Sequence, residues 1–219
     1  MINNIIFDFD GVLVDSELLA GKAFSRYLAT RNLHLSEQEF SRQYSGNKLV
    51  EVISKLSLRF NIKDQKSFFN EILSFSNSIY LKELTAVVGV RNFLNNIDQK
   101  KFIGSNRGKK SIIEGLKTVN LQKYFHEKNI FSFDMVDRPK PDPDIYLKAI
   151  EDTKIEPINT VILEDSIIGV RAAVAANIKV IGITSGGHWL DRPTHSLLDA
   201  GANAVATSFE EVLKLIQEL

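Results

Sequence analysis

Short apolar runs alternate with longer amphipathic stretches from about residue 87 to the end of the chain. The apolar runs predict strands at residues 101–103, 130–133, 161–163, 179–183 and 204–206. The stretches between them have apolar residues at helical spacing, with Asp142 and Pro143 favouring one helix start and Ser208 another. Such alternation predicts an α/β fold, a Rossmann-like and mostly parallel sheet with helices on both faces.

The chain between residues 16 and 84 has a different pattern, which is almost entirely helical. Residues 36–39 have the spacing of a capping box, and apolar residues between positions 68 and 80 predict a long amphipathic helix. The apolar run at residues 5–7 is too short to form an independent strand, so it belongs with the later sheet. We therefore expect an α/β core of residues 1–15 and 85–219, with residues 16–84 as a helical insertion.

The composition excludes several classes of function. Lys plus Arg and Asp plus Glu both number 27 in the 219 residues, so no global charge attracts nucleic acid or an acidic membrane. Without cysteine there is no thiolate catalysis, disulfide or cysteine-based zinc site. No apolar stretch is long enough to span a bilayer, and no leader precedes the first strand, so the expected location is the cytoplasm.

Polar side chains follow four of the predicted strands. Ligands bind at the carboxyl ends of parallel strands, so these side chains are expected to form one site. They are Asp8 and Asp10 after the first strand, Ser105 and Asn106 after the second, Lys140 after the third, and Glu164 and Asp165 after the fourth.

Crowded carboxylates repel one another, and a hard divalent cation relieves that repulsion. Oxygen ligands without cysteine or a nearby histidine favour Mg²⁺. A lysine and a hydroxyl beside the ion suit a phosphate, and one carboxylate is able to attack phosphorus while a second exchanges protons. The residues therefore predict Mg²⁺-assisted phosphoryl transfer.

These residues resemble the haloacid dehalogenase superfamily of phosphotransferases. The family has four motifs, and this chain has a similar segment for each of them in the same order: residues 8–17 (DFDGVLVDSE), 105–106 (SN), 140–143 (KPDP), and 164–166 (EDS) with Gly169 and Ala173. The resemblance covers essentially the whole chain. The helical insertion resembles the cap domain of the β-phosphoglucomutase and phosphoglycolate phosphatase branch.

The resemblance implies a role for each matching residue. Asp8 is expected to be the nucleophile, forming an aspartyl-phosphate, and Asp10 the general acid/base. Ser105 is expected to hydrogen-bond the transferring phosphoryl group, and Lys140 to neutralise charge on that group and on Asp8.

The same resemblance implies a Mg²⁺ site. Asp8, the backbone carbonyl of Asp10, and Asp165 are the expected ligands, with Glu164 binding the ion or orienting its waters. A dehalogenase needs neither the metal nor an acid/base at position 10, so these residues favour phosphate chemistry.

Substrate-binding residues are expected on both parts of the chain. Asn106 and Arg107 adjoin Ser105, and an arginine there suits an anionic substrate. In the insertion, Asn47 and Lys48 fall in a break between helices that resembles the substrate-specificity loop of this branch.

The predicted function is hydrolysis of a small phosphorylated metabolite such as a sugar phosphate, phosphogluconate or phosphoglycolate. A β-phosphoglucomutase-like phosphomutase is the alternative, although residues 18–22 lack the histidine that such a cap contributes. A non-enzymatic binding or regulatory protein is a third possibility, because fold alone does not determine function. The expected assembly is a monomer or a weak homo-oligomer.

Overall fold

The chain forms two compact units and passes from the first to the second and back. The segments before and after the second unit lie next to each other. The computed structural model describes residues 1–44, 47, 49–189 and 194–219. Its units are Met1–Asp15 with Thr85–Leu219, and Ser16–Leu84. The Asp15 amide donates to the Thr85 carbonyl at 2.9 Å, and the Val87 amide donates to the Leu13 carbonyl at 3.2 Å. The outgoing and returning segments are therefore paired with each other in the first unit.

The first unit is built on a parallel sheet. Within the described residues the sheet has six strands in the order β3-β2-β1-β4-β5-β6. All neighbouring strands run parallel. The strands are β1 (Asn4–Phe7), β2 (Lys100–Ser105), β3 (Ile130–Ser132), β4 (Thr160–Glu164), β5 (Lys179–Ile183) and β6 (Ala204–Ala206). The chain winds outward in both directions from β1 and β4, and ligands bind at such a reversal of strand order.

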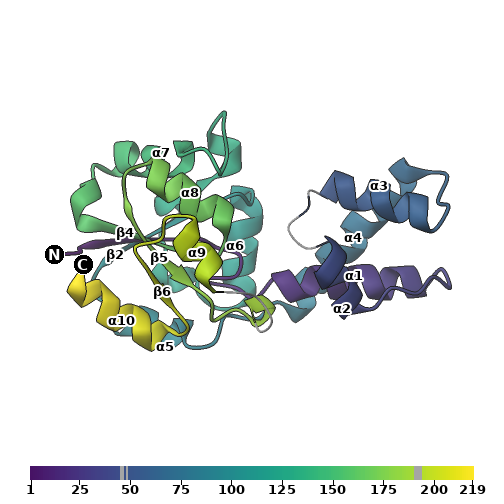
Figure 1. Ribbon diagram of the computed structural model, residues 1–219, viewed down its shortest axis with the longest axis horizontal. Helices are drawn as coiled ribbons and strands as arrows, with labels where there is room; N and C mark the ends of the chain where they lie inside the picture. Colours follow the sequence, from purple (N-terminus) through teal and green to yellow (C-terminus); the bar gives the residue numbers. More distant parts are fainter. Residues whose placement is uncertain (45–46, 48, 190–193) are drawn as a thin grey trace. The chain divides into compact units, whose positions relative to one another are not determined.

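Helices cover both faces of this sheet (Figure 1). In that view α7 (Asp144–Thr153) and α8 (Ile167–Ala175) lie above the strands, and α5 (Val90–Asn95) and α10 (Phe209–Glu218) lie below them. Among the described residues the other α-helices of this unit are α6 (Lys109–Thr118) and α9 (His195–Asp199). Because both faces are buried, residues 5–7 of β1 form a continuous apolar run rather than an alternating one.

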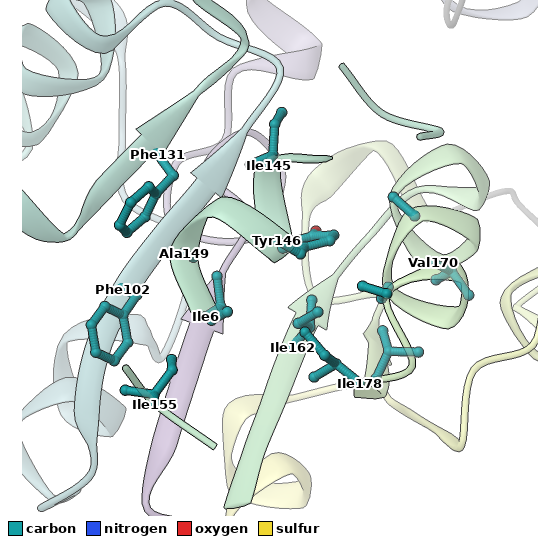
Figure 2. Packing of buried hydrophobic residues seen from close by; sticks show 14 of the residues in the cluster. Ile6, Phe102, Phe131, Ile145, Tyr146, Ala149, Ile155, Ile162, Val170 and Ile178 are labelled. Carbon is teal, nitrogen blue, oxygen red and sulfur yellow. The ribbon is translucent and has the colours of Figure 1, made fainter. Parts of the chain in front are cut away.

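The apolar core continues across the sheet on both sides. On one side, Ile6 and Ile162 pack with Tyr146 of α7 and Val170 of α8, as Figure 2 shows. On the other, the ring of Phe7 makes edge contacts with aromatic rings, including that of Phe93 on α5 at 6.1 Å between centroids. The neighbouring residues Ile6 and Phe7 thus anchor opposite faces, which fixes the register of β1 beneath the site.

The second unit is helical. It contains α1 (Glu17–Ala29), α2 (Glu37–Tyr44), α3 (Leu49–Arg59) and α4 (Gln65–Glu83) around an aromatic and aliphatic core. The ring of Phe24 on α1 stacks on that of Phe40 on α2 at 4.7 Å. The Ser36 hydroxyl accepts a hydrogen bond from the Glu39 amide at 3.1 Å, as the capping-box spacing predicts.

The predicted fold class is confirmed, with one local correction at the start of α7. Helix α7 has Pro143 at its N-cap and begins at Asp144, so Asp142 is not the capping residue; it lies in the preceding loop, which contains a cis Lys140–Pro141 bond. Helix α10 starts as expected, with the Ser208 hydroxyl accepting from the Glu211 amide at 3.3 Å. In the portion of the chain described, no helix has the length and apolar character needed to cross a membrane.

Candidate active site

The segment after β1 turns immediately after its first acidic residue. The Asp8 amide still donates to the Leu163 carbonyl of β4 at 2.9 Å, which holds Asp8 beside the end of that strand. The chain then reverses around Gly11, whose φ of 78° is accessible to glycine at little cost. Strand geometry does not continue to Asp10, so the alternation of side chains in a strand does not place Asp10 beside Asp8. The two carboxylates instead have different partners.

Lys140 joins the ends of β1 and β4 through its ammonium group. Its Nζ lies 2.8 Å from Oδ1 of Asp8 and 2.6 Å from Oε1 of Glu164. All three side chains are buried, with 2% of the lysine side chain exposed. The structure thus brings together three residues that the sequence assigned to one site from three different segments.

Glu164 has its acceptor capacity filled by protein donors. Oε1 accepts from Lys140 and from the Tyr146 hydroxyl at 2.9 Å, and Oε2 accepts from the Ser166 amide at 3.1 Å and hydroxyl at 2.9 Å. A carboxylate has about four acceptor sites, so these donors account for all of them. A Cβ on Gly169 would lie 1.7 Å from Oε1 of Glu164, so only glycine allows α8 to approach this carboxylate so closely.

Tyr146 is a site residue that the sequence analysis missed. Besides its bond to Glu164, its ring centroid lies 4.8 Å from Nζ of Lys140, within the range of a cation–π contact. The ring packs against β2, where a Cβ on Gly104 would lie 2.9 Å from it. A tyrosine on an apolar helix face predicts core packing, and nothing in its spacing indicates where the hydroxyl points.

Ser105 and Asn106 position neighbouring backbone. The buried Ser105 hydroxyl oxygen accepts from the Arg107 amide at 3.1 Å. The Asn106 amide nitrogen donates to the Lys140 carbonyl at 3.0 Å, and its oxygen accepts from the Lys140 amide at 2.9 Å. The side chain of Asn106, which was predicted to bind substrate, is therefore hydrogen-bonded to the backbone of Lys140.

Arg107 binds the carboxylate of Asp10 through two of its nitrogens. Nε lies 3.0 Å from Oδ1 and 2.8 Å from Oδ2, and Nη2 lies 2.7 Å from Oδ1. The sequence predicted that Arg107 faces the site, but not that Asp10 is its partner.

The predicted substrate residues of the helical unit are described only in part. The side chain of Asn47 donates to the Tyr44 carbonyl at 3.0 Å and accepts from Nζ of Lys55 at 3.2 Å. Lys48 lies outside the described residues.

Burial and neighbouring charge dominate the electrostatics of the cluster. Burial raises the pKa of the Asp8 carboxyl well above its usual range, Lys140 opposes this shift, and Glu164 and Asp165 add to it. Burial lowers the pKa of Lys140, but Asp8 and Glu164 outweigh that effect and raise it well above its ordinary value. These neighbours therefore favour the charged form of the lysine, and positive charge beside Asp8 favours its ionised form.

Asp8, Glu164 and Asp165, here called the acidic cluster, fit a divalent cation. Each is buried, and one carboxylate oxygen of each lies within 4.8 Å of the others. Three carboxylates and one ammonium leave two negative charges, which a divalent cation balances. An all-oxygen donor set fits Mg²⁺. Because the bonding capacity of Glu164 is already used, Asp8 and Asp165 are the residues suited to direct ligation.

A family model described as "Haloacid dehalogenase-like hydrolase" matches residues 5–183, a span that contains the acidic cluster, Lys140 and the helical unit. The chain belongs to this family. It is also similar over most of its length to two phosphatases. It is 31% identical to a phosphorylated carbohydrates phosphatase from Thermotoga maritima, with 98% of each chain covered. It is 25% identical to a 6-phosphogluconate phosphatase from Escherichia coli, with 85% of each covered.

The fold is also found among solved haloacid dehalogenase-like structures. One is a Thermotoga maritima protein whose assignment as a β-phosphoglucomutase is provisional. It superposes with a TM-score of 0.86 at 30% identity and covers 100% of both chains. The family and the phosphatases among these relatives confirm the predicted enzyme class, a phosphoric monoester hydrolase.

Proposed function

We propose that this chain is a Mg²⁺-dependent phosphatase of a small phosphorylated metabolite, and that Asp8 carries the phosphoryl group as an aspartyl-phosphate. The observation that carries the proposal is the contact of Lys140 with Asp8 and Glu164 inside the buried acidic cluster. A purely structural ion pair would not require a third buried carboxylate, Asp165, beside the first two. Excess buried negative charge is costly to folding unless a ligand or cation uses it.

In the first step, a carboxylate oxygen of Asp8 attacks the phosphorus of the substrate. The bond between phosphorus and the ester oxygen breaks, and the departing alcohol takes a proton from Asp10. Lys140 stabilises negative charge on Asp8 and on the phosphoryl oxygens, and the Ser105 hydroxyl donates a hydrogen bond to that group.

In the second step, Asp10 accepts a proton from a water molecule, whose oxygen attacks the same phosphorus. The bond to Asp8 breaks, and inorganic phosphate leaves with Asp8 restored as a carboxylate. One carboxylate thus acts first as an acid and then as a base.

A bound Mg²⁺ would neutralise charge on the phosphoryl oxygens. Asp8, Asp165 and the backbone carbonyl of Asp10 are the groups assigned to hold it. Glu164 is assigned to the layer behind these ligands, since Lys140, Tyr146 and Ser166 already occupy it.

The substrate class follows from the relatives and from the site. The relatives act on phosphorylated carbohydrates and on 6-phosphogluconate, as their names state, which supports a sugar phosphate, phosphogluconate or phosphoglycolate here. The helical unit is assigned the role of a cap that selects the substrate, and Asn47 and Lys48 are its candidate substrate contacts. Flexing of the cap is expected where the chain passes between the units, near residues 14–16 and 84–89.

Phosphate release from a panel of phosphorylated metabolites tests the proposal. The panel contains glucose 6-phosphate, 6-phosphogluconate and phosphoglycolate, each with Mg²⁺ and with chelator. We expect the native protein to need Mg²⁺, and Asp8→Asn to lose activity by at least about a thousandfold. Asp152→Asn, an exposed acid paired with Lys148 on α7, is the matched control and should behave as native. Metal-independent release, or an active Asp8→Asn variant, would contradict the proposal.

Phosphomutase activity is the second candidate, favoured by the resemblance to the provisional β-phosphoglucomutase. The first turns of α1 contain no histidine, which disfavours it. Conversion of glucose 1-phosphate to glucose 6-phosphate with a bisphosphate primer, faster than phosphate release, would establish it.

A further inference from the structure

The guanidinium of Arg107 and the carboxylate of Asp10 form a bidentate ion pair that is accessible to a ligand. Three contacts of 2.7 to 3.0 Å join them. Of the two side chains, 29% and 23% respectively are exposed, whereas Lys140 and Asp8 are buried. The pair therefore lies at the open side of the site.

The pairing with Arg107 interferes with the general acid/base role proposed for Asp10. To exchange protons with the leaving alcohol and then with water, Asp10 must turn an oxygen toward each of them. Two N–H groups bind this carboxylate: Nη2–H donates to Oδ1, and the single Nε–H is shared between Oδ1 and Oδ2, so both oxygens face the guanidinium. The contacts with Arg107 therefore have to loosen during turnover.

An anionic group is the partner best able to replace Asp10 on Arg107. Charge-assisted hydrogen bonds to carboxylate or phosphate are about twice as strong as neutral ones, so a sugar hydroxyl is a poor substitute. Because Asp10 acts at the leaving alcohol, a group that meets Arg107 beside it belongs to the leaving part of the substrate. Lys140 and Ser105 are assigned to the transferring phosphoryl group.

We propose that Arg107 is a specificity residue that exchanges Asp10 for a second anionic group, a carboxylate or second phosphate, on the substrate. The inference rests on the proposed phosphatase function. The backbone supports this placement, because the Arg107 amide donates to the Ser105 hydroxyl oxygen at 3.1 Å and α6 begins two residues later. Recognition of a doubly anionic substrate then releases Asp10 for proton transfer.

The test compares two six-carbon phosphates that differ in charge at C1. 6-Phosphogluconate has a carboxylate where glucose 6-phosphate has a neutral hemiacetal. We expect Arg107→Gln to lower the ratio of their kcat/KM values about tenfold or more, mainly by a loss for 6-phosphogluconate. Arg107→Lys keeps the charge without the chelate and should give an intermediate ratio. Because both substrates are measured on one preparation, the ratio does not depend on the folded fraction.

Arg138→Gln is the matched control. Arg138 also chelates a carboxylate, with Nε 3.1 Å and Nη2 2.9 Å from the two oxygens of Asp144, but its side chain is 66% exposed. This variant should leave the substrate ratio unchanged.

Equal losses for both substrates in Arg107→Gln would overturn the inference, since Arg107 would then serve the phosphoryl group or the fold. Native activity of Arg107→Gln on both substrates would overturn it as well. If the native protein releases phosphate from neither compound, the proposed function fails separately. Calorimetric binding of both compounds to Asp8→Asn, with and without Arg107→Gln, then tests the exchange, and equal discrimination in the two proteins would overturn it.

Discussion

At the scale of single residues, the position of Lys140 depends on hydrogen bonds from side chains of several other segments. Glu164 holds its ammonium from one side, and Tyr146 and Ser166 hold Glu164. Asn106 fixes the lysine backbone through two hydrogen bonds. A lysine side chain has many rotamers, and this network removes that freedom before substrate arrives.

Removing the Tyr146 hydroxyl should weaken this network without creating a cavity. In Tyr146→Phe, Glu164 loses one of its four donors. We expect the free energy of unfolding to fall by about 1 kcal/mol and kcat to fall about three- to tenfold, with KM nearly unchanged. Denaturant unfolding and steady-state kinetics measure the two effects.

Tyr124→Phe is the corresponding control, because its hydroxyl bonds Asn95 at 2.6 Å outside the site. It should leave kcat at the native value. A Tyr146→Phe variant that loses stability but keeps native kcat would show that the hydroxyl is structural only.

At the scale of elements, α1 and α4 of the helical unit are joined by a polar contact at the edge of their apolar interface. Hydrogen bonds from Ser67, Tyr27 and Arg31 lower the pKa of Glu71 from 4.5 to about 2. Burial, followed by the bond to Glu71, raises the pKa of Tyr27 from 10.0 to about 12.

These shifts predict pH-dependent stability. A lowered carboxyl pKa stabilises the folded state fully above about pH 4.5, and this stabilisation is lost as pH falls toward about 2. A raised tyrosine pKa stabilises the fold below about pH 10, and this is lost as pH rises toward about 12. The difference in Tm between native protein and Glu71→Gln should therefore shrink between pH 4.5 and 2. A constant difference across that range would show that Glu71 does not act through its charge.

The sequence predicts elements well where burial decides them. The apolar run of β1 is continuous because both of its faces are covered, and polar residues after β2 and β4 follow from the parallel arrangement. Side-chain partners are less predictable, because spacing assigns a residue to a strand end and not to a neighbour. The pairing of Arg107 with Asp10 depends on the turn at Gly11, and the contact of Tyr146 with Glu164 depends on how α7 packs.

At the scale of the whole molecule, the helical unit is an insertion whose two ends meet. Val14 and Ala86 form an antiparallel bridge between the crossings, inside the first unit. A short linker is therefore able to replace the insertion without separating the strands of the sheet.

A variant with residues 16–84 replaced by a glycine–serine linker tests which unit carries out hydrolysis and which selects the substrate. We expect cooperative unfolding and Mg²⁺-dependent hydrolysis of a small aryl phosphate, because the acidic cluster and Lys140 lie wholly in the first unit. Discrimination among neutral sugar phosphates should be lost, since the cap is proposed to select them, whereas the preference for a second anionic group that is proposed for Arg107 should remain. A folded variant that keeps the native preference among neutral sugar phosphates would place that selection in the core unit.

Identification of the residue that carries the phosphoryl group is the decisive test of an aspartyl-phosphate at Asp8. The protein is mixed with substrate and Mg²⁺, quenched in acid before steady state, and reduced with borohydride, which converts an aspartyl-phosphate to homoserine. Peptide mass spectrometry should find homoserine at position 8 in the native protein and not in Asp8→Asn. A phosphoryl group on another residue, or phosphate release by Asp8→Asn at the native rate, would contradict the account.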